Sequence, residues 1–365
     1  MSEWQTFCLK DLGKIVGGAT PPTNNPKNYG NKIAWITPKD LSTLQWRYIK
    51  KGSRSISRLG FKSCSCVLLP KHAILFSSRA PIGYVAIAEK RLCTNQGFKS
   101  IIPNKKIYFE FLYYLLKYHK DNISNIGGGT TFKEVSGATL GLFQVKIPPT
   151  YYEQQKIART LSVLDQKIEN NHKINELLHT LAYKIYEYYF KYKPKNAKLE
   201  QIIIENPKSN IMVKNAQKTQ DKYPFFTSGD NILSYPKAII DGRNCFLNTG
   251  GNAGIKFYVG KASYSTDTWC ICANEFSDYL YLLLSSIKNH INQSFFQGTS
   301  LKHLQKNLLK KYPIYMPSAH EIKKFNQIIM PLLTLISINT RTSKKLEQIR
   351  DFLLPLLLKQ QVKPK

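Results

Sequence analysis

The sequence predicts an α+β protein in which two mixed α/β domains are separated by two long antiparallel coiled-coil helices. Three observations support this prediction: a short phrase that occurs twice, two long runs of heptad spacing, and, in each half of the chain, short β-type runs that precede a helix. We expect a first domain at 1–150, a first long helix at 151–193, a second domain at 194–319 and a second long helix at 320–365.

A phrase near the end of the first domain returns near the end of the second. The chain reads GGTTFK at 128–133 and QGTSLK at 297–302. The distance to the next matching proline is 19 residues in both copies, from Gly129 to Pro148 and from Gly298 to Pro317. A helical pattern that opens with a glutamate follows each proline, so the repeated unit is a domain followed by a long helix.

The two domains show the same order of elements. In the first, β-type runs occur at 33–36, 73–76 and 84–87, and a short helix is expected around 108–118. A linker at 191–198 that contains Pro194 precedes the second domain. There, β-type runs occur at 238–240, 255–259 and 269–272, and a helix is expected near 278–289. Both domains are therefore predicted to place strands first and a helix late.

The first long helix is expected from about residue 153 to residue 192, a stretch without proline or glycine. Its apolar residues fall on alternate steps of three and four, the spacing of a coiled-coil seam. Asn171 and Asn175 occupy this seam, where a buried amide weakens packing but fixes register. The second helix repeats the pattern, although each stripe alone also fits a helix packed on its own domain. The residues expected to pair the helices are Leu164, Ile168, Asn171, Asn175, Leu178, Ile185, Leu335, Asn339, Leu346, Ile349 and Leu353.

Basic residues exceed acidic residues by a wide margin, with 53 Lys and Arg against 23 Asp and Glu and a formal net charge of +30. They are spread along both halves of the chain. Such a surplus favours a polyanionic partner, because each cation that neutralises a phosphate releases condensed counterions. A nucleic acid is the expected partner, and an anionic membrane or a generally basic proteome are the alternatives.

The ends of the chain and its cysteines indicate a cytoplasmic protein with no membrane partner. The first residues do not begin a signal peptide, and the cysteine count of seven is odd. The longest apolar stretch near the end, 352–358, is too short to cross a bilayer and contains Pro355.

No catalytic signature is found. The chain has no Gly-Lys-Ser/Thr phosphate loop and no Asn-Pro-Pro-Tyr tetrapeptide, and the Glu-x-Lys at 321–323 lacks the upstream acidic pair of a metal-dependent nuclease. The Cys-x-Cys pairs at 64–66 and 270–272 are spaced too closely for a typical zinc site. We therefore expect no catalytic and no metal-binding residues. A methyltransferase or nuclease with an unrecognised site is the alternative.

Since no catalytic or metal site is found, the sequence indicates a surface that recognises a ligand. Residues 46–54 interleave aromatic and basic side chains, and the loops at 77–83 and 248–254 each follow an apolar strand and carry hydroxyl, amide or guanidinium groups. A solvated strand edge or an ordinary turn is the alternative for each. The candidate DNA-binding residues are Lys39, Arg47, Lys50, Lys51, Arg54, Ser78, Arg79, Asn95, Gln96, Thr130, Lys133, Thr227, Ser228, Asn248, Thr249, Asn252, Lys256, Thr299 and Lys302.

Over nearly its whole length the chain resembles the specificity subunits of type I restriction–modification enzymes. The segments that carry the resemblance are 12–13, 17–21, 33–41, 74–83, 94–98, 147–148, 153–158 with Leu161, 164–169 and 349–357. The run at 153–169, which begins EQQKIA, is similar to the central shared segment of the family and is the most specific of them. The second domain keeps the opening pattern poorly, and the residues at 358–360 depart from the usual polar-glycine ending.

The resemblance implies a subunit without catalysis. Each recognition domain would read one half of a split site in double-stranded DNA, while the long helices set the gap and dock two methyltransferase subunits. Restriction subunits would supply the nuclease and translocase. No cofactor is expected in this chain, because S-adenosylmethionine, ATP and magnesium would serve the partner subunits.

Overall fold

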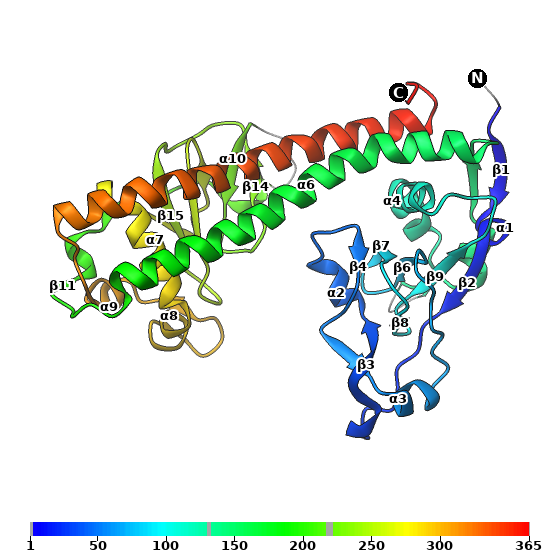
Figure 1. Cartoon of the computed structure of the whole chain (residues 1–365), viewed down its shortest axis with the longest axis horizontal. Helices are drawn as coiled ribbons and strands as arrows, with labels where there is room; N and C mark the ends of the chain where they lie inside the picture. The colour runs from blue at the N-terminus through cyan, green and yellow to red at the C-terminus, as the bar shows by residue number, and fades with distance from the viewer. Residues whose placement is uncertain (1–2, 130–132, 217–221, 365) are drawn as a thin grey trace. The chain divides into compact units, whose positions relative to one another are not determined.

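The computed structural model describes residues 3–129, 133–216 and 222–364 (Figure 1). The chain folds into two compact units. Unit 1 consists of Met1–Glu169 and Lys345–Lys365, and unit 2 consists of Asn170–Lys344. Two long helices, α6 (Tyr151–Tyr186) and α10 (Ala319–Leu358), contribute residues to both units.

Unit 1 contains two main β-sheets and a pair of strands that closes the domain. Its strands are β1 (Gln5–Cys8), β2 (Gly13–Gly17), β3 (Tyr29–Ile36), β4 (Tyr48–Ile49), β5 (Arg54–Ile56), β6 (Ile74–Ser78), β7 (Ile82–Ala88), β8 (Cys93–Thr94), β9 (Lys99–Pro103) and β10 (Gln144–Ile147). Its shorter helices are α1 (Leu9–Leu12), α2 (Pro38–Ser42), α3 (Arg58–Lys62), α4 (Phe109–Asn125) and α5 (Gly137–Leu142). The larger sheet has the order β2-β9-β6-β7-β4 and the smaller one β5-β3-β8.

Unit 2 has the same kinds of sheet. Its strands are β11 (Ala197–Lys198), β12 (Ile204–Glu205), β13 (Tyr223–Phe226), β14 (Leu233–Tyr235), β15 (Arg243–Asn248), β16 (Ile255–Val259), β17 (Ser263–Tyr264), β18 (Thr268–Cys272), β19 (Phe296–Gln297), β20 (His303–Leu304) and β21 (Pro313–Ile314). Its shorter helices are α7 (Ser277–Ser286), α8 (Lys288–Ser294) and α9 (Lys306–Lys310). The larger sheet has the order β12-β18-β15-β16, and a smaller one has the order β14-β13-β17.

The two domains repeat one topology. In the first, the antiparallel pair β6–β7 is followed by β8, which runs parallel to β3. In the second, the antiparallel pair β15–β16 is followed by β17, which runs parallel to β13. The first and last strands of each domain pair antiparallel, β1 with β10 and β11 with β21, so the chain enters and leaves each domain through neighbouring strands. The prediction of two mixed α/β domains with a long helix between them is confirmed.

Each domain shares a hydrophobic core with the long helices. In unit 1, Phe76 of the sheet and Phe111 of α4 lie in one buried cluster with Leu161 of α6 and Leu357 of α10. In unit 2, the corresponding cluster joins α7 to Phe190, just beyond α6, and to Phe325 of α10. Because burial of such side chains is the main stabilising term in folding, each domain is packed onto its helix segments rather than merely tethered to them.

The structure changes some predicted elements. The run at 238–240 is not a strand, since only an isolated bridge joins Ile240 to Ala262 there. The helix predicted at 108–118 extends to Asn125 in α4, and the helix predicted near 278–289 is divided into α7 and α8. Short apolar runs do not reveal whether a neighbouring strand is available to pair with them, which explains the first error.

Both long helices begin with the same capping device. At the start of α6, the backbone N–H of Glu153 donates to Thr150 Oγ1 at 3.2 Å, while Thr150 Oγ1 donates to Glu153 Oε2 at 3.1 Å. At the start of α10, the backbone N–H of Ser318 donates to Glu321 Oε2 at 2.9 Å, and the N–H of Glu321 donates to Ser318 Oγ at 3.3 Å. These bonds satisfy N–H groups that the first turn of a helix leaves unpaired. Glu321 therefore starts a helix and is not part of a nuclease motif.

Within unit 2, α6 and α10 lie side by side and run antiparallel. Asn171 Nδ2 donates to Ser343 Oγ at 3.1 Å, and Asn339 Nδ2 donates to Asn175 Oδ1 at 2.9 Å. Residue numbers therefore rise along one helix as they fall along the other. Of the other residues expected to pair the helices, Ile168 is buried and Leu164, Leu178, Ile185, Leu346 and Leu353 are half-buried.

The structure contradicts the prediction that two residues of α10 face the paired helix. Leu335 and Ile349 are 42% and 47% exposed. The buried face of α10 lies one residue further along, at positions that include Ile336, Ser343 and Leu354. One residue turns an α-helix by about 100°, so this shift moves a side chain from the paired face to the outer face.

Candidate nucleic-acid interface

Three segments of the first domain that are far apart in the sequence meet in one polar corner. Ser78, at the end of β6, donates its backbone N–H to Gly97 O at 2.8 Å. Its carbonyl oxygen accepts the backbone N–H of Val135 at 3.0 Å. These bonds join residues 78–79, 95–97 and 133–134, which we call corner 1.

The second domain contains a corner built in the same way. Thr249, just after β15, donates its backbone N–H to Asp267 O at 3.2 Å. Its carbonyl oxygen accepts the backbone N–H of Leu304 at 3.0 Å. Residues 248–252, 265–267 and 302–303 thereby form corner 2.

In each domain, paired backbone groups flank the repeated segment beside the corner. In the first domain, Gly128 and Glu134 exchange backbone hydrogen bonds of 3.0 and 2.8 Å. In the second, β19 and β20 pair Gln297 with His303. The glycine that follows the first strand has a positive φ in both, +119° at Gly129 and +138° at Gly298, a backbone conformation that L side chains rarely adopt. The second copy therefore forms a hairpin turn. In the first copy, Gly128 and Glu134 pair on either side of 130–132, which lie outside the described residues.

Most of the predicted cations are exposed. Lys39 lies on α2, whose first turn packs against the turn of corner 1, since a Cβ at Gly97 would lie 2.9 Å from Pro38 Cγ. Arg54 stacks over Tyr29, with its guanidinium carbon 4.2 Å from the ring centre. The other exposed candidates are Lys50, Lys51, Gln96, Lys133, Asn252, Thr299 and Lys302. Thr130 lies outside the described residues.

One carboxylate organises the cations of corner 1. Glu134 forms ion pairs with Arg79 at 3.5 Å and with Lys99 at 3.2 Å. Arg79 is half-exposed, so its guanidinium keeps donors that face solvent. Lys99 was not among the predicted residues, because a single lysine in a strand carries no distinguishing pattern.

Arg47 was predicted to lie at the DNA interface, but the structure buries it. Its side chain is only 5% exposed, and it forms ion pairs with Glu110 at 3.1 Å and with Glu169 of α6 at 3.2 Å. Its backbone N–H also donates to Glu169 at 2.8 Å. Tyr48 donates its hydroxyl to Glu110, and burial together with this bond raises the pKa of Tyr48. Arg47 therefore attaches the first domain to α4 and α6 and does not face a ligand.

Three more residues predicted to contact DNA are buried: Ser78, Thr227 and Asn248. Ser78 Oγ donates to Gly97 O at 3.2 Å. Lys256 Nζ donates to Thr227 O at 2.8 Å and to Asn248 Oδ1 at 3.2 Å, and burial lowers the pKa of Lys256. These buried residues therefore stabilise the two corners through their bonds and do not face a ligand.

Three other candidates are half-buried and bonded within the corners. Asn95 Oδ1 accepts the backbone N–H of Gly97 at 3.0 Å. Ser228 Oγ and Thr249 Oγ1 both donate to Asp267 O, the latter at 2.7 Å. Two exposed residues of corner 2 were not predicted, His303 and Thr266, and Thr266 corresponds to Gln96. The segments 94–98 and 264–268 share no identical residue at matching positions, so the sequence does not indicate this correspondence. The matching hydrogen bonds of the two corners reveal it.

The described part of the chain holds neither a candidate metal cluster nor a candidate membrane-spanning helix. No group of three or more His, Cys, Asp or Glu side chains at 3–129, 133–216 or 222–364 is placed to hold a metal ion. Over the same residues, no helix combines the length and hydropathy needed to span a bilayer.

The chain matches a known family over most of its length. The family is described as the type I restriction modification DNA specificity domain, and the match covers residues 1–180 and 195–348. The repeat seen in the topology is thus matched twice, once in each half.

Curated relatives point to the same family, and a solved structure shares the fold. The type I restriction enzyme MjaIX specificity subunit of Methanocaldococcus jannaschii is 32% identical over an alignment of 403 positions that covers 98% of this chain and 93% of the relative. The HindI specificity subunit of Haemophilus influenzae is 30% identical over 177 positions, covering 46% of this chain and 37% of the relative. The crystal structure of a type I restriction-modification S subunit from M. genitalium has the same fold, with a TM-score of 0.62 and 18% identity over 97% of this chain and 96% of that chain.

Proposed function

The chain belongs to the family of type I restriction–modification DNA specificity proteins, and we propose that each of its two domains reads one half of a split site in double-stranded DNA. A specificity subunit is not catalytic, since methylation and cleavage belong to methyltransferase and restriction subunits. The partner subunits would use S-adenosylmethionine, ATP and magnesium.

The observation that carries this proposal is the repeated corner. Corner 1 and corner 2 have the same three-segment construction, with matching bonds through Ser78 in one and Thr249 in the other. Their exposed side chains differ, since Gln96 stands where the second domain has Thr266. Two domains that recognise different half-sites need the same backbone arrangement with different exposed side chains, and the two corners have this construction.

The charge of the chain supports DNA as the ligand. The net charge of +30 is accompanied by exposed lysines beside both corners, Lys39 and Lys133 in the first domain and Lys302 in the second. Contacts to phosphate position a protein on the duplex, and contacts to base edges select the sequence. We assign the lysines to the first task and the exposed polar side chains of the corners to the second.

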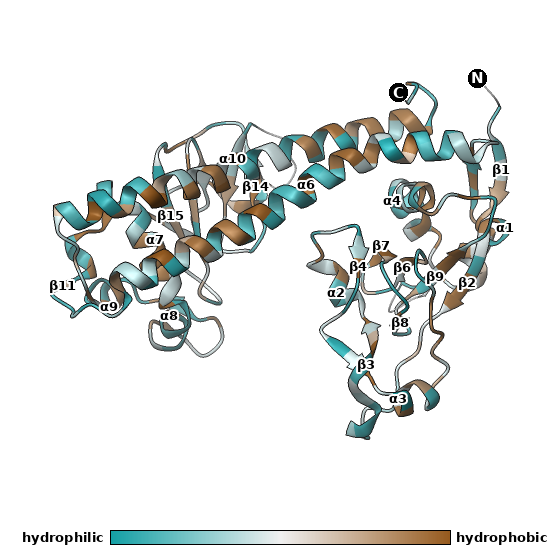
Figure 2. Ribbon diagram, viewed as in Figure 1, coloured by the Kyte–Doolittle hydropathy of each residue, from teal (hydrophilic) through white to brown (hydrophobic). Residues whose placement is uncertain are grey.

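Apolar stripes on the outer faces of the long helices support docking of methyltransferase subunits. In unit 2, Ile174, Leu177 and Leu181 follow one another on α6 at steps of three and four, and Leu177 is 62% exposed. In unit 1, Ile349 and Phe352 form a similar outward pair on α10, with Phe352 68% exposed. Figure 2 shows hydrophobic residues recurring along both helices. Exposed apolar stripes of this kind mark protein contacts, so one partner for each unit is proposed.

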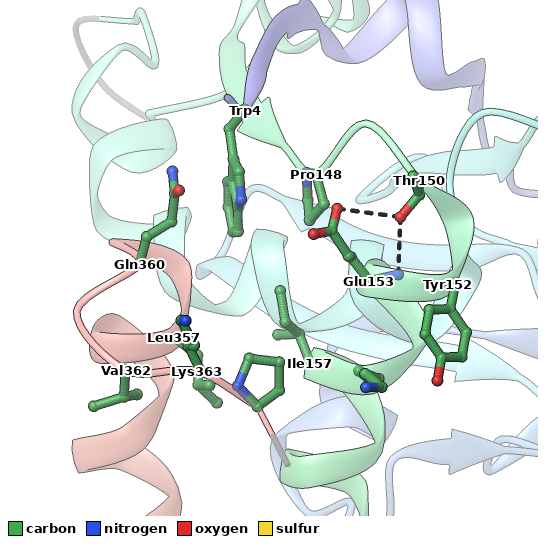
Figure 3. A pocket seen from close by; sticks show the side chains of 12 residues that line it. Trp4, Pro148, Thr150, Tyr152, Glu153, Ile157, Leu357, Gln360, Val362 and Lys363 are labelled. Atoms are coloured by element: carbon green, nitrogen blue, oxygen red, sulfur yellow. Dashed lines mark hydrogen bonds between the residues drawn. The ribbon is translucent and has the colours of Figure 1, made fainter. Parts of the chain in front are cut away.

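Unit 1 also has a hollow between the start of α6 and the end of the chain (Figure 3). Trp4, Ile157, Leu357 and Val362 line it with apolar surface, and Tyr152 stands at its edge. We propose that this hollow extends the surface on which unit 1 docks its methyltransferase subunit.

The test is co-expression with the cognate methyltransferase subunit, followed by sequencing of the methylome. The expected result is methylation at a single split motif with two defined halves and an unspecified spacer. The purified chain alone, supplied with S-adenosylmethionine and magnesium, should neither methylate nor cut DNA. A continuous motif, or activity of the chain alone that a single substitution abolishes, would contradict the proposal.

A further inference from the structure

In the first domain, the turn at 95–97 exposes a single polar side chain. The Asn95 amide oxygen is used inside the turn, where it accepts the backbone N–H of Gly97. Gly97 O accepts bonds from the backbone N–H of Ser78 at 2.8 Å and from Ser78 Oγ at 3.2 Å. Gln96 lies between these anchored residues and is exposed. The turn is therefore held on both sides of Gln96 and presents its amide outward.

Thr20 orients the Gln96 amide. Thr20 Oγ1 donates a hydrogen bond to Gln96 Oε1. This contact requires residues 17–20 to pass close to the turn, and a Cβ at Gly18 would lie 2.0 Å from Asn95 O. Glycine at position 18 thus permits the approach. With one lone pair occupied, the amide keeps one acceptor site on Oε1 and two N–H donors.

The second domain has the same turn with a different exposed side chain. Asp267 O accepts the backbone N–H of Thr249 at 3.2 Å and Thr249 Oγ1 at 2.7 Å, just as Gly97 O accepts both groups of Ser78. The exposed residue between the anchored positions is Thr266. It offers a hydroxyl and a methyl group where the first domain offers an amide.

We propose that Gln96 and Thr266 occupy the base-contacting position of their domains, and that Gln96 selects an adenine in the first half-site. This inference rests on the proposed function of reading split DNA. A primary amide places a donor beside an acceptor, which matches N7 and N6 of adenine in the major groove. A threonine hydroxyl pairs with more than one base, and its methyl group contacts that of thymine. The second half-site is therefore read less selectively at the corresponding base pair.

The test uses the whole chain, co-expressed with its cognate methyltransferase subunit, and reads the methylome. Gln96→Ala should weaken the adenine preference at one base pair of one half-site roughly tenfold or more and leave the other half unchanged. Gln96→Glu should move the preference at that base pair to cytosine, because a carboxylate accepts a hydrogen bond from cytosine N4. Gln45→Ala removes an exposed glutamine of the first domain outside corner 1, and it should leave the motif unchanged.

Thr266→Gln tests the same position in the second domain by adding the amide. It should create an adenine preference in the other half-site only, and this gain does not depend on how well a Gln96 variant folds. If the wild-type chain gives a split motif and neither the Gln96 variants nor Thr266→Gln changes a single base pair, the inference is overturned and the proposed function stands. A wild-type chain without a split motif overturns both. Uniform loss of methylation in Gln96→Ala, with unchanged thermal unfolding, assigns Gln96 to overall affinity and also overturns the inference.

Discussion

Arg47 and Arg54 lie in the same aromatic and basic run, yet their surroundings give them different roles. The Arg54 guanidinium is exposed and stacks over Tyr29. The Arg47 guanidinium is buried against Glu110 and Glu169. A cation taken out of water is tolerated only beside counter-charges, because its desolvation otherwise costs several kcal/mol. Arg47 therefore fixes the first domain to the helices of unit 1, while Arg54 remains exposed to solvent.

Arg47→Met should destabilise unit 1. It leaves Glu110 and Glu169 largely buried without their cation, which costs about 3–5 kcal/mol where a buried pair is broken. Urea unfolding followed by circular dichroism would measure the change. The control is Lys50→Met, which removes an exposed pair with Glu89 and should cost less than about 1 kcal/mol. Equal effects of the two substitutions would contradict the role assigned to Arg47.

Lys39 and Lys133 should contact phosphate rather than bases. Replacing both with alanine should weaken binding to cognate and unrelated DNA alike, and the slope of log K against log salt should fall by about 2. Fluorescence anisotropy over a salt series would measure it. A loss confined to cognate DNA would instead assign these lysines to base contacts.

At the scale of the helix, α10 carries two apolar stripes. The inner stripe, with Ile336 and Leu354, packs in the core, and the outer stripe, with Leu335 and Ile349, faces solvent. Heptad spacing is present in both, so spacing alone does not identify the paired face. The polar residues are better guides, because Asn175 and Asn339 meet between the helices.

The Asn175–Asn339 pair should show strong coupling. Asn175→Leu alone leaves the Asn339 amide without its acceptor and should cost about 1–3 kcal/mol. The double variant with Asn339→Leu should recover most of this loss, because both polar groups are then removed together. Thermal unfolding of the two single variants and the double variant would give the coupling energy. Additive losses would show that the two amides act independently.

The outer stripe of α6 should be needed for assembly and not for DNA binding. Leu177→Glu combined with Leu181→Glu places two charges on the exposed stripe of unit 2 and should abolish association with the methyltransferase subunit. Pull-down with the purified partner would measure it, with DNA affinity measured in parallel. Asn289→Glu combined with Gln293→Glu adds the same charges on exposed positions of α8 and should leave association with the methyltransferase subunit unchanged. Retained association of the leucine variant would locate the docking surface elsewhere.

At the scale of the molecule, each domain is an insertion that begins and ends at one pair of strands. β11 pairs with β21 through Ala197 with Ile314 and Lys198 with Pro313. Residues 199–312 therefore leave and return at adjacent points, and both long helices lie outside this segment. The construction allows one reader to be exchanged without a change in the helices.

Exchange of residues 199–312 for the matching segment of a relative with another motif should change one half of the recognised site. The other half and the spacer length should stay the same, because the first domain and both long helices are untouched. Methylome sequencing of the exchanged protein would show this. A change in both halves would contradict the assignment of one half-site to each domain.

The repeat, the two mixed α/β domains and the long helix between them could be predicted from the sequence, because they depend on periodicity, turn residues and spacing along the chain. Individual site residues could be predicted only in part. Lys39, Gln96 and Lys302 are exposed as expected. Arg47 and Ser78 are buried in bonds to residues distant in the sequence, and Asn248 is buried in bonds to Asn252 and Lys256. A residue type indicates what a side chain can bond, and the packing around it decides whether it faces solvent.

By itself the sequence determined that this chain is a repeated, basic, two-domain protein, since charge and heptad spacing are properties of local order. Only the tertiary structure decided that Thr249 takes the place of Ser78, and that Thr266 corresponds to Gln96. That correspondence consists of hydrogen bonds between segments far apart in the chain. Such bonds arise when the sheets fold, and no pattern of neighbouring residues encodes them.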